Sequence, residues 1–153
     1  MEYARTVGEL LPTILTEILL DLRFNVIVKS QRANGVDMKI YFGDSLFAVA
    51  EVLNWSIGSR LTVKRRDKII ENLNEFSCHK ILVHTVPLIN LHGIQEHGIQ
   101  RIEIGYQILP EEYYNFYSAR RQTIRRKADN PIVRAEIANK VMLHLIRSRL
   151  IRH

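Results

Sequence analysis

Apolar residues in the first forty positions change from helical to strand spacing. From Val7 to Leu22 they recur every three or four positions, which predicts an amphipathic opening helix. Pro12 falls inside this stretch, so we expect it either in the first turn of the helix or at a kink. The short apolar run 24–28 predicts a first strand, and the polar segment 30–35 predicts a turn.

Two further apolar segments predict an antiparallel hairpin. Val36–Phe42 and Leu46–Val52 flank Gly43-Asp44-Ser45, which is typical of a tight turn. With this turn at the centre, the numbers of facing residues sum to about 88, as antiparallel pairing requires. The register therefore places Asp37 directly opposite Glu51.

The second half of the chain returns to alternating helices and strands. The first predicted elements are a helix over 60–76, with Ser59 as its N-cap, and a strand over 80–86. A short helix over 88–97 and a strand over 101–109 follow. The next predicted helix begins at Pro110 and continues through the arginines near 120–127. Asn130-Pro131 predicts the start of a last helix, which runs to about Ile151. Its apolar face comprises Ile137, Val141, Leu145 and, at its edge, Met142.

This order of elements predicts an α/β fold with a mixed central sheet flanked by helices. We expect one domain, with residues 1–109 as the core and 110–153 as a basic helical extension packed on it. No apolar run reaches membrane-spanning length, and the N-terminus lacks the pattern of a signal peptide. The single cysteine, Cys78, fits a reducing cytoplasm and is expected to be buried and inert.

Positive charge is concentrated in the C-terminal part of the chain. Residues 1–110 contain 12 Lys and Arg and 12 Asp and Glu, whereas residues 111–153 contain 10 basic and 4 acidic residues. The net charge of +6 therefore lies entirely in the tail. Nucleic acid is a natural partner for such a segment, and the clustering favours it over the alternative of a solvated helix face. The candidate nucleic-acid contacts in the tail are Arg120, Arg121, Arg125, Arg126 and Lys127.

The facing carboxylates of Asp37 and Glu51 indicate a metal site. Like charges opposed on a sheet are destabilising unless a cation neutralises them. Carboxylate ligands that leave room for water suit Mg²⁺ or Mn²⁺, which can polarise a phosphate. The alternative is that Asp37 closes a loop and that Glu51 pairs with a nearby arginine.

The string NGVDMKIYF…LFAVAEVLNW, together with the element order, resembles the PD-(D/E)xK nuclease superfamily, especially its archaeal Holliday-junction-resolvase and Mrr-like members. Asp37 and Glu51 match the two acids of that motif, and Asn54 and Trp55 match residues that often follow it. The resemblance implies a restriction-endonuclease-like fold, a metal-dependent activity on DNA and a homodimer. It also implies a helical glutamate at the metal, either Glu9, which we favour, or Glu17.

One motif position departs from this family. The lysine that should follow the second acid by two residues is Leu53, which cannot orient water or offset phosphate charge. Lys39 shares a face with Asp37 but lies on the far side of the acids. Lysines on neighbouring elements replace the motif lysine in some members of this superfamily. The candidates here are Lys64, Arg60 and Lys29, with Arg60 and Lys64 also expected to contact nucleic acid.

The sequence therefore leaves three functions open. The leading hypothesis is a divalent-metal-dependent endonuclease in which Asp37, Glu51 and Lys64 are catalytic and Asp37, Glu51 and Glu9 hold the metal. The second is a nucleic-acid-binding protein that kept this fold and lost the chemistry, which Leu53 favours. The third, a domain that binds small molecules or proteins, does not account for the charge of the tail.

Overall fold

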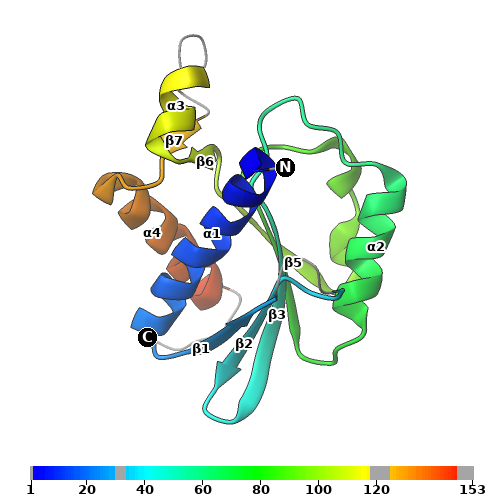
Figure 1. Cartoon of the computed structure of the whole chain (residues 1–153). Helices are drawn as coiled ribbons and strands as arrows, with labels where there is room; N and C mark the ends of the chain where they lie inside the picture. Colours follow the sequence, from blue (N-terminus) through cyan, green and yellow to red (C-terminus); the bar gives the residue numbers. More distant parts are fainter. Residues whose placement is uncertain (1, 30–33, 118–124, 148–153) are drawn as a thin grey trace.

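The computed structural model describes residues 2–29, 34–117 and 125–147. A five-stranded mixed sheet forms the centre (Figure 1). Its strands, which lie side by side in chain order, are β1 (Asn25–Val28), β2 (Met38–Phe42), β3 (Ser45–Leu53), β4 (His79–His84) and β5 (Ile99–Glu103). β1, β2 and β3 are antiparallel, and β3, β4 and β5 are parallel. The predicted α/β class with a mixed sheet flanked by helices is confirmed.

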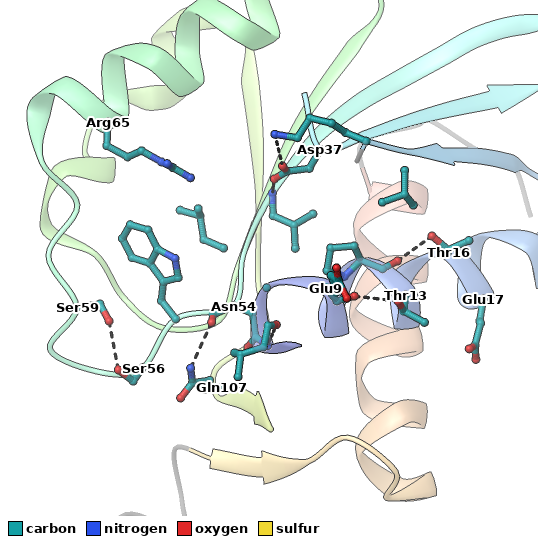
Figure 2. Close-up of a pocket in the computed structure, with 18 of the residues that line it drawn as sticks. Glu9, Thr13, Thr16, Glu17, Asp37, Asn54, Ser56, Ser59, Arg65 and Gln107 are labelled. Carbon is teal, nitrogen blue, oxygen red and sulfur yellow. Dashed lines mark hydrogen bonds and ion pairs between the residues drawn. The ribbon is translucent and has the colours of Figure 1, made fainter. Parts of the chain in front are cut away.

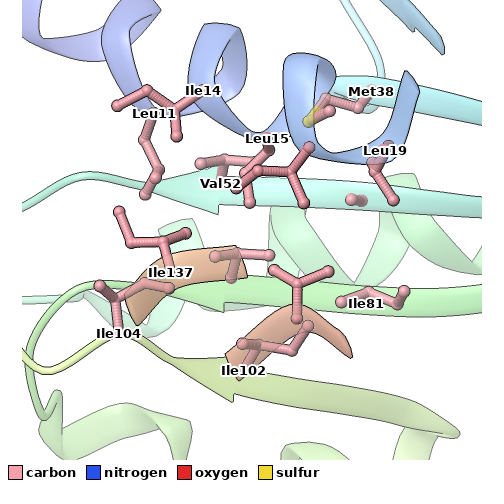
Figure 3. Packing of buried hydrophobic residues seen from close by; sticks show 14 of the residues in the cluster. Leu11, Ile14, Leu15, Leu19, Met38, Val52, Ile81, Ile102, Ile104 and Ile137 are labelled. Atoms are coloured by element: carbon pink, nitrogen blue, oxygen red, sulfur yellow. The ribbon is translucent and has the colours of Figure 1, made fainter. Parts of the chain in front are cut away.

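Helices cover both faces of this sheet. α1 (Glu2–Asp21) and α4 (Pro131–Arg147) lie on one face, where residues such as Leu11, Val52 and Ile137 form a common core (Figures 1 and 3). The other face is covered by α2 (Val63–Asn74) and the 3-10 helices η1 (Ile89–Leu91) and η2 (Ile94–His97), which enclose a second apolar cluster. The sheet is therefore the middle layer of three.

The C-terminal part of the chain joins this core through a helix and a small second sheet. α4 contributes Val133, Ile137, Val141 and Leu145 to the first apolar cluster, three of which were predicted from sequence. Asn130 caps this helix as predicted, because its side chain accepts a hydrogen bond from Ile132 N at 2.9 Å. β6 (Gln107–Leu109) and β7 (Arg125–Lys127) pair in parallel, with α3 (Glu111–Tyr117) between them in the chain.

The predicted hairpin register is confirmed at the end far from the turn, next to Asp37 and Glu51. Met38 pairs with Ala50 and Lys39 pairs with Val49, and an irregularity after Ile40 shifts the register only near the turn. Pro12, by contrast, lies well inside α1, because the helix begins at Glu2 rather than near Val7. Proline has no N–H, so the Gly8 carbonyl lacks its partner four residues on.

The predicted start of α2 is wrong by several residues. Ser59 does not cap the helix, because Ser59 N donates to Ser56 O at 3.1 Å and closes a turn instead. Thr62 is the cap, and its hydroxyl accepts a hydrogen bond from Arg65 N at 3.1 Å. Gly58, at φ +84°, supplies the left-handed conformation that this turn needs.

Glycines also explain two other corrections. The predicted helix over 88–97 is two 3-10 helices, because Gly93 between them adopts φ +78°. The predicted strand over 101–109 is divided between the two sheets at Gly105, whose φ is +102°. Gly105 N donates to Thr85 O at 2.7 Å, which turns the chain away from the main sheet. No described helix is both long and apolar enough to cross a membrane.

Candidate functional site

A cleft of about 1040 Å³ opens at the end of the sheet where β3 and the first half of α1 meet. Its lining contains three acids proposed from the sequence, Glu9, Glu17 and Asp37, together with three cations, Lys29, Arg60 and Arg65. Figure 2 shows the acidic side chains of α1 on one wall and Arg65 at the start of α2 on the opposite wall. Gly8 and Pro12, between which the helical hydrogen bond is missing, also line the cleft.

Asp37 immediately precedes β2 and is held by the ends of two other strands. Its backbone carbonyl accepts a hydrogen bond from Lys29 N at 2.9 Å, which continues the β1–β2 ladder. Its carboxylate Oδ2 accepts a hydrogen bond from Val52 N at 2.8 Å. Its other oxygen, Oδ1, lies 3.5 Å from the Lys29 ammonium (Figure 2). Three strands therefore fix one carboxylate and one cation at the same point of the cleft.

Glu51 lies beside Asp37 but is buried behind it. Its side chain is 3% exposed and does not line the cleft. Burial, followed by the charge and the hydrogen bond of Asp37, raises the pKa of Glu51 to about 8, against the lowering effects of Asn72 and Lys29. Asn72 of α2 donates to Glu51 Oε1 at 3.2 Å. At neutral pH, Glu51 therefore keeps its proton and is hydrogen-bonded to Asp37.

The motif position of the missing lysine is part of the core. Leu53 is 1% exposed and belongs to the apolar cluster under α2. Lys39 pairs with Val49, as predicted, and its ammonium lies 5.6 Å from the centre of the Phe76 ring, away from the acids. Lys64 is exposed and does not line the cleft, whereas its neighbour Arg65, which the sequence did not single out, does. Of the proposed replacement cations, Lys29 is the one in contact with an acid of the pair.

The two helical glutamates occupy different surroundings. Both are exposed and line the cleft, but Glu17 forms an ion pair with Arg134 of α4. Among the described residues, no three His, Cys, Asp or Glu side chains lie close enough together to hold one ion. The structure thus brings Asp37 and Glu51 together and leaves Glu9 outside that pair.

Three of the five candidate nucleic-acid contacts of the tail lie on a strand rather than on the predicted helix. Arg125, Arg126 and Lys127 form β7, because they pair with the apolar strand β6. Arg126 stacks over Tyr106 at 5.0 Å, and Lys127 pairs with Glu111 at 3.5 Å. Arg125 is the register partner of Gln107, which lines the cleft. Arg120 and Arg121 lie outside the described residues.

The side chain of Asn54 connects three elements that border the cleft. From the sequence, Asn54 was noted only as a residue that often follows the nuclease motif. Its side-chain amide donates to Val7 O at 3.0 Å and to Ile108 O at 2.8 Å, and its oxygen accepts from Ile108 N at 2.9 Å. The side chain is buried, so these bonds tie β3 to α1 and to β6. A polar residue directly after a continuous apolar strand was the available signal.

Replacing Asn54 by alanine should lower the free energy of unfolding by roughly 2–4 kcal/mol, because three buried backbone groups lose their partner. Urea denaturation followed by circular dichroism measures this. Asn74→Ala is the matched control, because Asn74 is exposed and its side chain bonds only to Lys80 at 3.0 Å. A loss below about 1 kcal/mol for Asn54→Ala would contradict the assigned role.

Comparisons of the chain with protein-family models, with curated proteins and with solved structures found no match.

Proposed function

We propose that the protein is a divalent-metal-dependent endonuclease of the restriction-endonuclease-like type that hydrolyses phosphodiester bonds of DNA. The observation that carries this proposal is the group formed by Asp37, Glu51 and Lys29. Glu51 is hydrogen-bonded to Asp37 and has its pKa raised to about 8, and the Lys29 ammonium lies 3.5 Å from Asp37 at a large cleft. Paired carboxylates with a strongly perturbed pKa, beside a cation in a cleft, are characteristic of functional sites.

The topology supports the same proposal. A helix, three antiparallel strands, a crossover helix and a parallel strand follow one another in the chain, as α1, β1–β3, α2 and β4. This is the order that the resemblance to PD-(D/E)xK nucleases implies. The two acids also lie where that resemblance places them, at the start of the second strand and near the end of the third.

The carboxylate oxygens of Asp37 and Glu51 fit Mg²⁺ or Mn²⁺. Mg²⁺ commonly takes one or two protein carboxylates and completes its shell with water and substrate phosphate, so a third protein ligand is not required. When bound, such an ion polarises the phosphate and lowers the pKa of water. Glu51 has to release its proton before both carboxylates are charged, so affinity for the ion should rise with pH.

The cations of the cleft supply the remaining functions. Lys29, in place of the residue at position 53, is positioned to orient the attacking water or to offset charge on the reacting phosphate. Arg60 and Arg65, on the opposite wall, would bind the flanking phosphates. β7 brings the charge of the tail beside Gln107 at the end of the cleft, where a longer nucleic acid would pass.

A binding protein without catalysis is the second candidate, and two observations favour it. Leu53 is packed into the core where the family has its lysine, and Glu51 is 3% exposed and bonded to Asn72. In this case the carboxyl pair would only stabilise the end of the β2–β3 hairpin. The cleft would bind nucleic acid through Arg60 and Arg65 alone.

A cleavage assay separates the two candidates. Linear duplex, single-stranded and four-way-junction DNA would be incubated with Mg²⁺ or Mn²⁺ and with wild type, Asp37→Asn or Glu51→Gln. Asp44→Asn is the matched control, because Asp44 is an exposed acid in the turn of the same hairpin. We expect metal-dependent cutting by wild type and control, and a loss of at least a hundredfold in both site variants. Intact substrates with every protein, despite salt-sensitive binding, would establish the binding function instead.

A further inference from the structure

We propose that the cleft receives an unpaired nucleotide whose base stacks on Trp55. This inference rests on the proposed function only in taking nucleic acid as the ligand of the cleft. Trp55 follows Asn54 directly after β3, is half-buried and lines the cleft together with Asp37 and Lys29. An indole facing a cleft that also holds cations is the combination that binds single strands, because every base offers a face for stacking.

The backbone of Trp55 is fixed on both sides, so the ring is held in place before any ligand arrives. Trp55 N donates a hydrogen bond to the Thr85 hydroxyl at 2.8 Å. The same hydroxyl donates to Trp55 O at 2.5 Å. Thr85 is fully buried, and part of the indole packs against the apolar cluster under α2. A rigid aromatic surface loses little conformational entropy when a base stacks on it.

The rest of the cleft suits a nucleotide better than a continuous duplex. Arg60 and Arg65 follow Trp55 in the chain and line the same cleft, and Figure 2 shows Arg65 reaching into it from the start of α2. They can bind the phosphates on either side of a stacked base. A volume of about 1040 Å³ is at the upper end for clefts that enclose small ligands. Because paired bases are stacked inside a duplex, only an unpaired base can present its face to the indole.

Trp55 is the only tryptophan of the chain, so its fluorescence reports on this cleft directly. Wild-type protein in EDTA and low salt would be titrated with a single-stranded twelve-residue oligothymidylate, with a blunt hairpin duplex and with an abasic oligonucleotide of the same length. We expect the oligothymidylate to quench the fluorescence and to bind at least tenfold more tightly than the abasic strand. The hairpin should leave the fluorescence nearly unchanged.

Variants provide the second measurement, with binding followed by the anisotropy of a labelled oligonucleotide. Trp55→Leu should weaken binding of oligothymidylate by tenfold or more, and Trp55→Phe should stay within a few fold of wild type, because a ring remains. Circular dichroism checks that both variants are folded. If the abasic strand binds as tightly as the oligothymidylate, or if a folded Trp55→Leu binds it like wild type, the proposed stacking is wrong.

These outcomes are independent of catalysis. Binding is measured without metal, and Asp44→Asn should quench as wild type does, because Asp44 is an exposed turn residue outside the lining of the cleft. Metal-dependent cutting without quenching by single strands would overturn the stacking inference and leave the nuclease proposal standing. Quenching without cutting would support the stacking inference and overturn the nuclease proposal.

Discussion

Replacing Lys29 by methionine should reduce metal-dependent cleavage by two to three orders of magnitude, the range found when one preorganised charge-stabilising group is removed from an active site. The reason is its position, because its ammonium lies 3.5 Å from Asp37 Oδ1 on the wall of the cleft. Methionine keeps the length and the apolar part of the side chain. Single-turnover rates with Mn²⁺, at saturating protein, would measure the effect on chemistry rather than on binding.

Lys64→Met is the matched control, because Lys64 is an exposed lysine at the start of α2 outside the lining of the cleft. Its rate should stay within a few fold of wild type. The pH profile gives a further check. The charge of Lys29 lowers the pKa of Glu51, so the residual activity of Lys29→Met should rise at a higher pH than that of wild type. If Lys64→Met loses activity and Lys29→Met keeps it, the sequence-based choice of Lys64 was right.

The hairpin and its acids could be predicted because their geometry is local. The position of a short turn between two antiparallel strands determines which residues face each other. The pairing of Met38 with Ala50 extends directly to Asp37 and Glu51. No packing information was needed to bring the two carboxylates together.

From the sequence, Lys29 could only be one of several candidates for the replacement lysine. Its position depends on the register of the first two strands, which the long connection between them does not define. The segment 30–35 between the first two strands is too long to act as a two-residue turn, so sequence could not align Lys29 with Asp37. In the structure, Val28 pairs with Met38, and this pairing places the next residue, Lys29, beside the carboxylate. The cap at Thr62 was missed for a similar reason, since two serines in the preceding loop bond to each other at 3.2 Å.

Long-range contacts account for what could not be predicted. β7 forms because Arg125–Lys127 pair with β6, which lies some eighteen residues earlier in the chain. The arginine-rich sequence by itself does not indicate a strand. The burial of Glu51 depends on α2 covering the sheet, with Asn72 reaching it from a distance of 21 residues in sequence. Sequence could place Glu51 opposite an acid, but the raised pKa of Glu51 also depends on burial beneath the helix packed above it.

Glu51→Gln should stabilise the protein at alkaline pH and leave its stability nearly unchanged at pH 5. The pKa of Glu51 is raised in the folded protein from its ordinary 4.5 to about 8, so its favourable contribution is complete below pH 4.5 and is lost as pH rises towards 8. Each pH unit in this window removes about 1.4 kcal/mol, which amounts to roughly 3–5 kcal/mol in total. Glutamine mimics the protonated acid and does not titrate.

Urea denaturation of wild type and Glu51→Gln in EDTA between pH 5 and 9 would measure the difference in unfolding free energy at each pH. Glu112→Gln is the control, because Glu112 is exposed in the first turn of α3 and should show no such trend. A difference between wild type and Glu51→Gln that is constant across pH would mean that Glu51 is ionised in the folded protein.

Adding Mn²⁺ to wild type and Glu51→Gln tests the proposed metal site. At pH 9, where Glu51 is ionised, Mn²⁺ should recover much of the stability that wild type has lost, because the cation replaces the proton of Glu51 between two carboxylates. Glu51→Gln should gain far less, since an amide is a weaker ligand than a carboxylate. At pH 6 the proton competes with the metal, so Mn²⁺ should change the melting temperature of wild type little. If Mn²⁺ has the same effect on both proteins at pH 9, then Glu51 holds no metal, and its burial serves only to stabilise the hairpin.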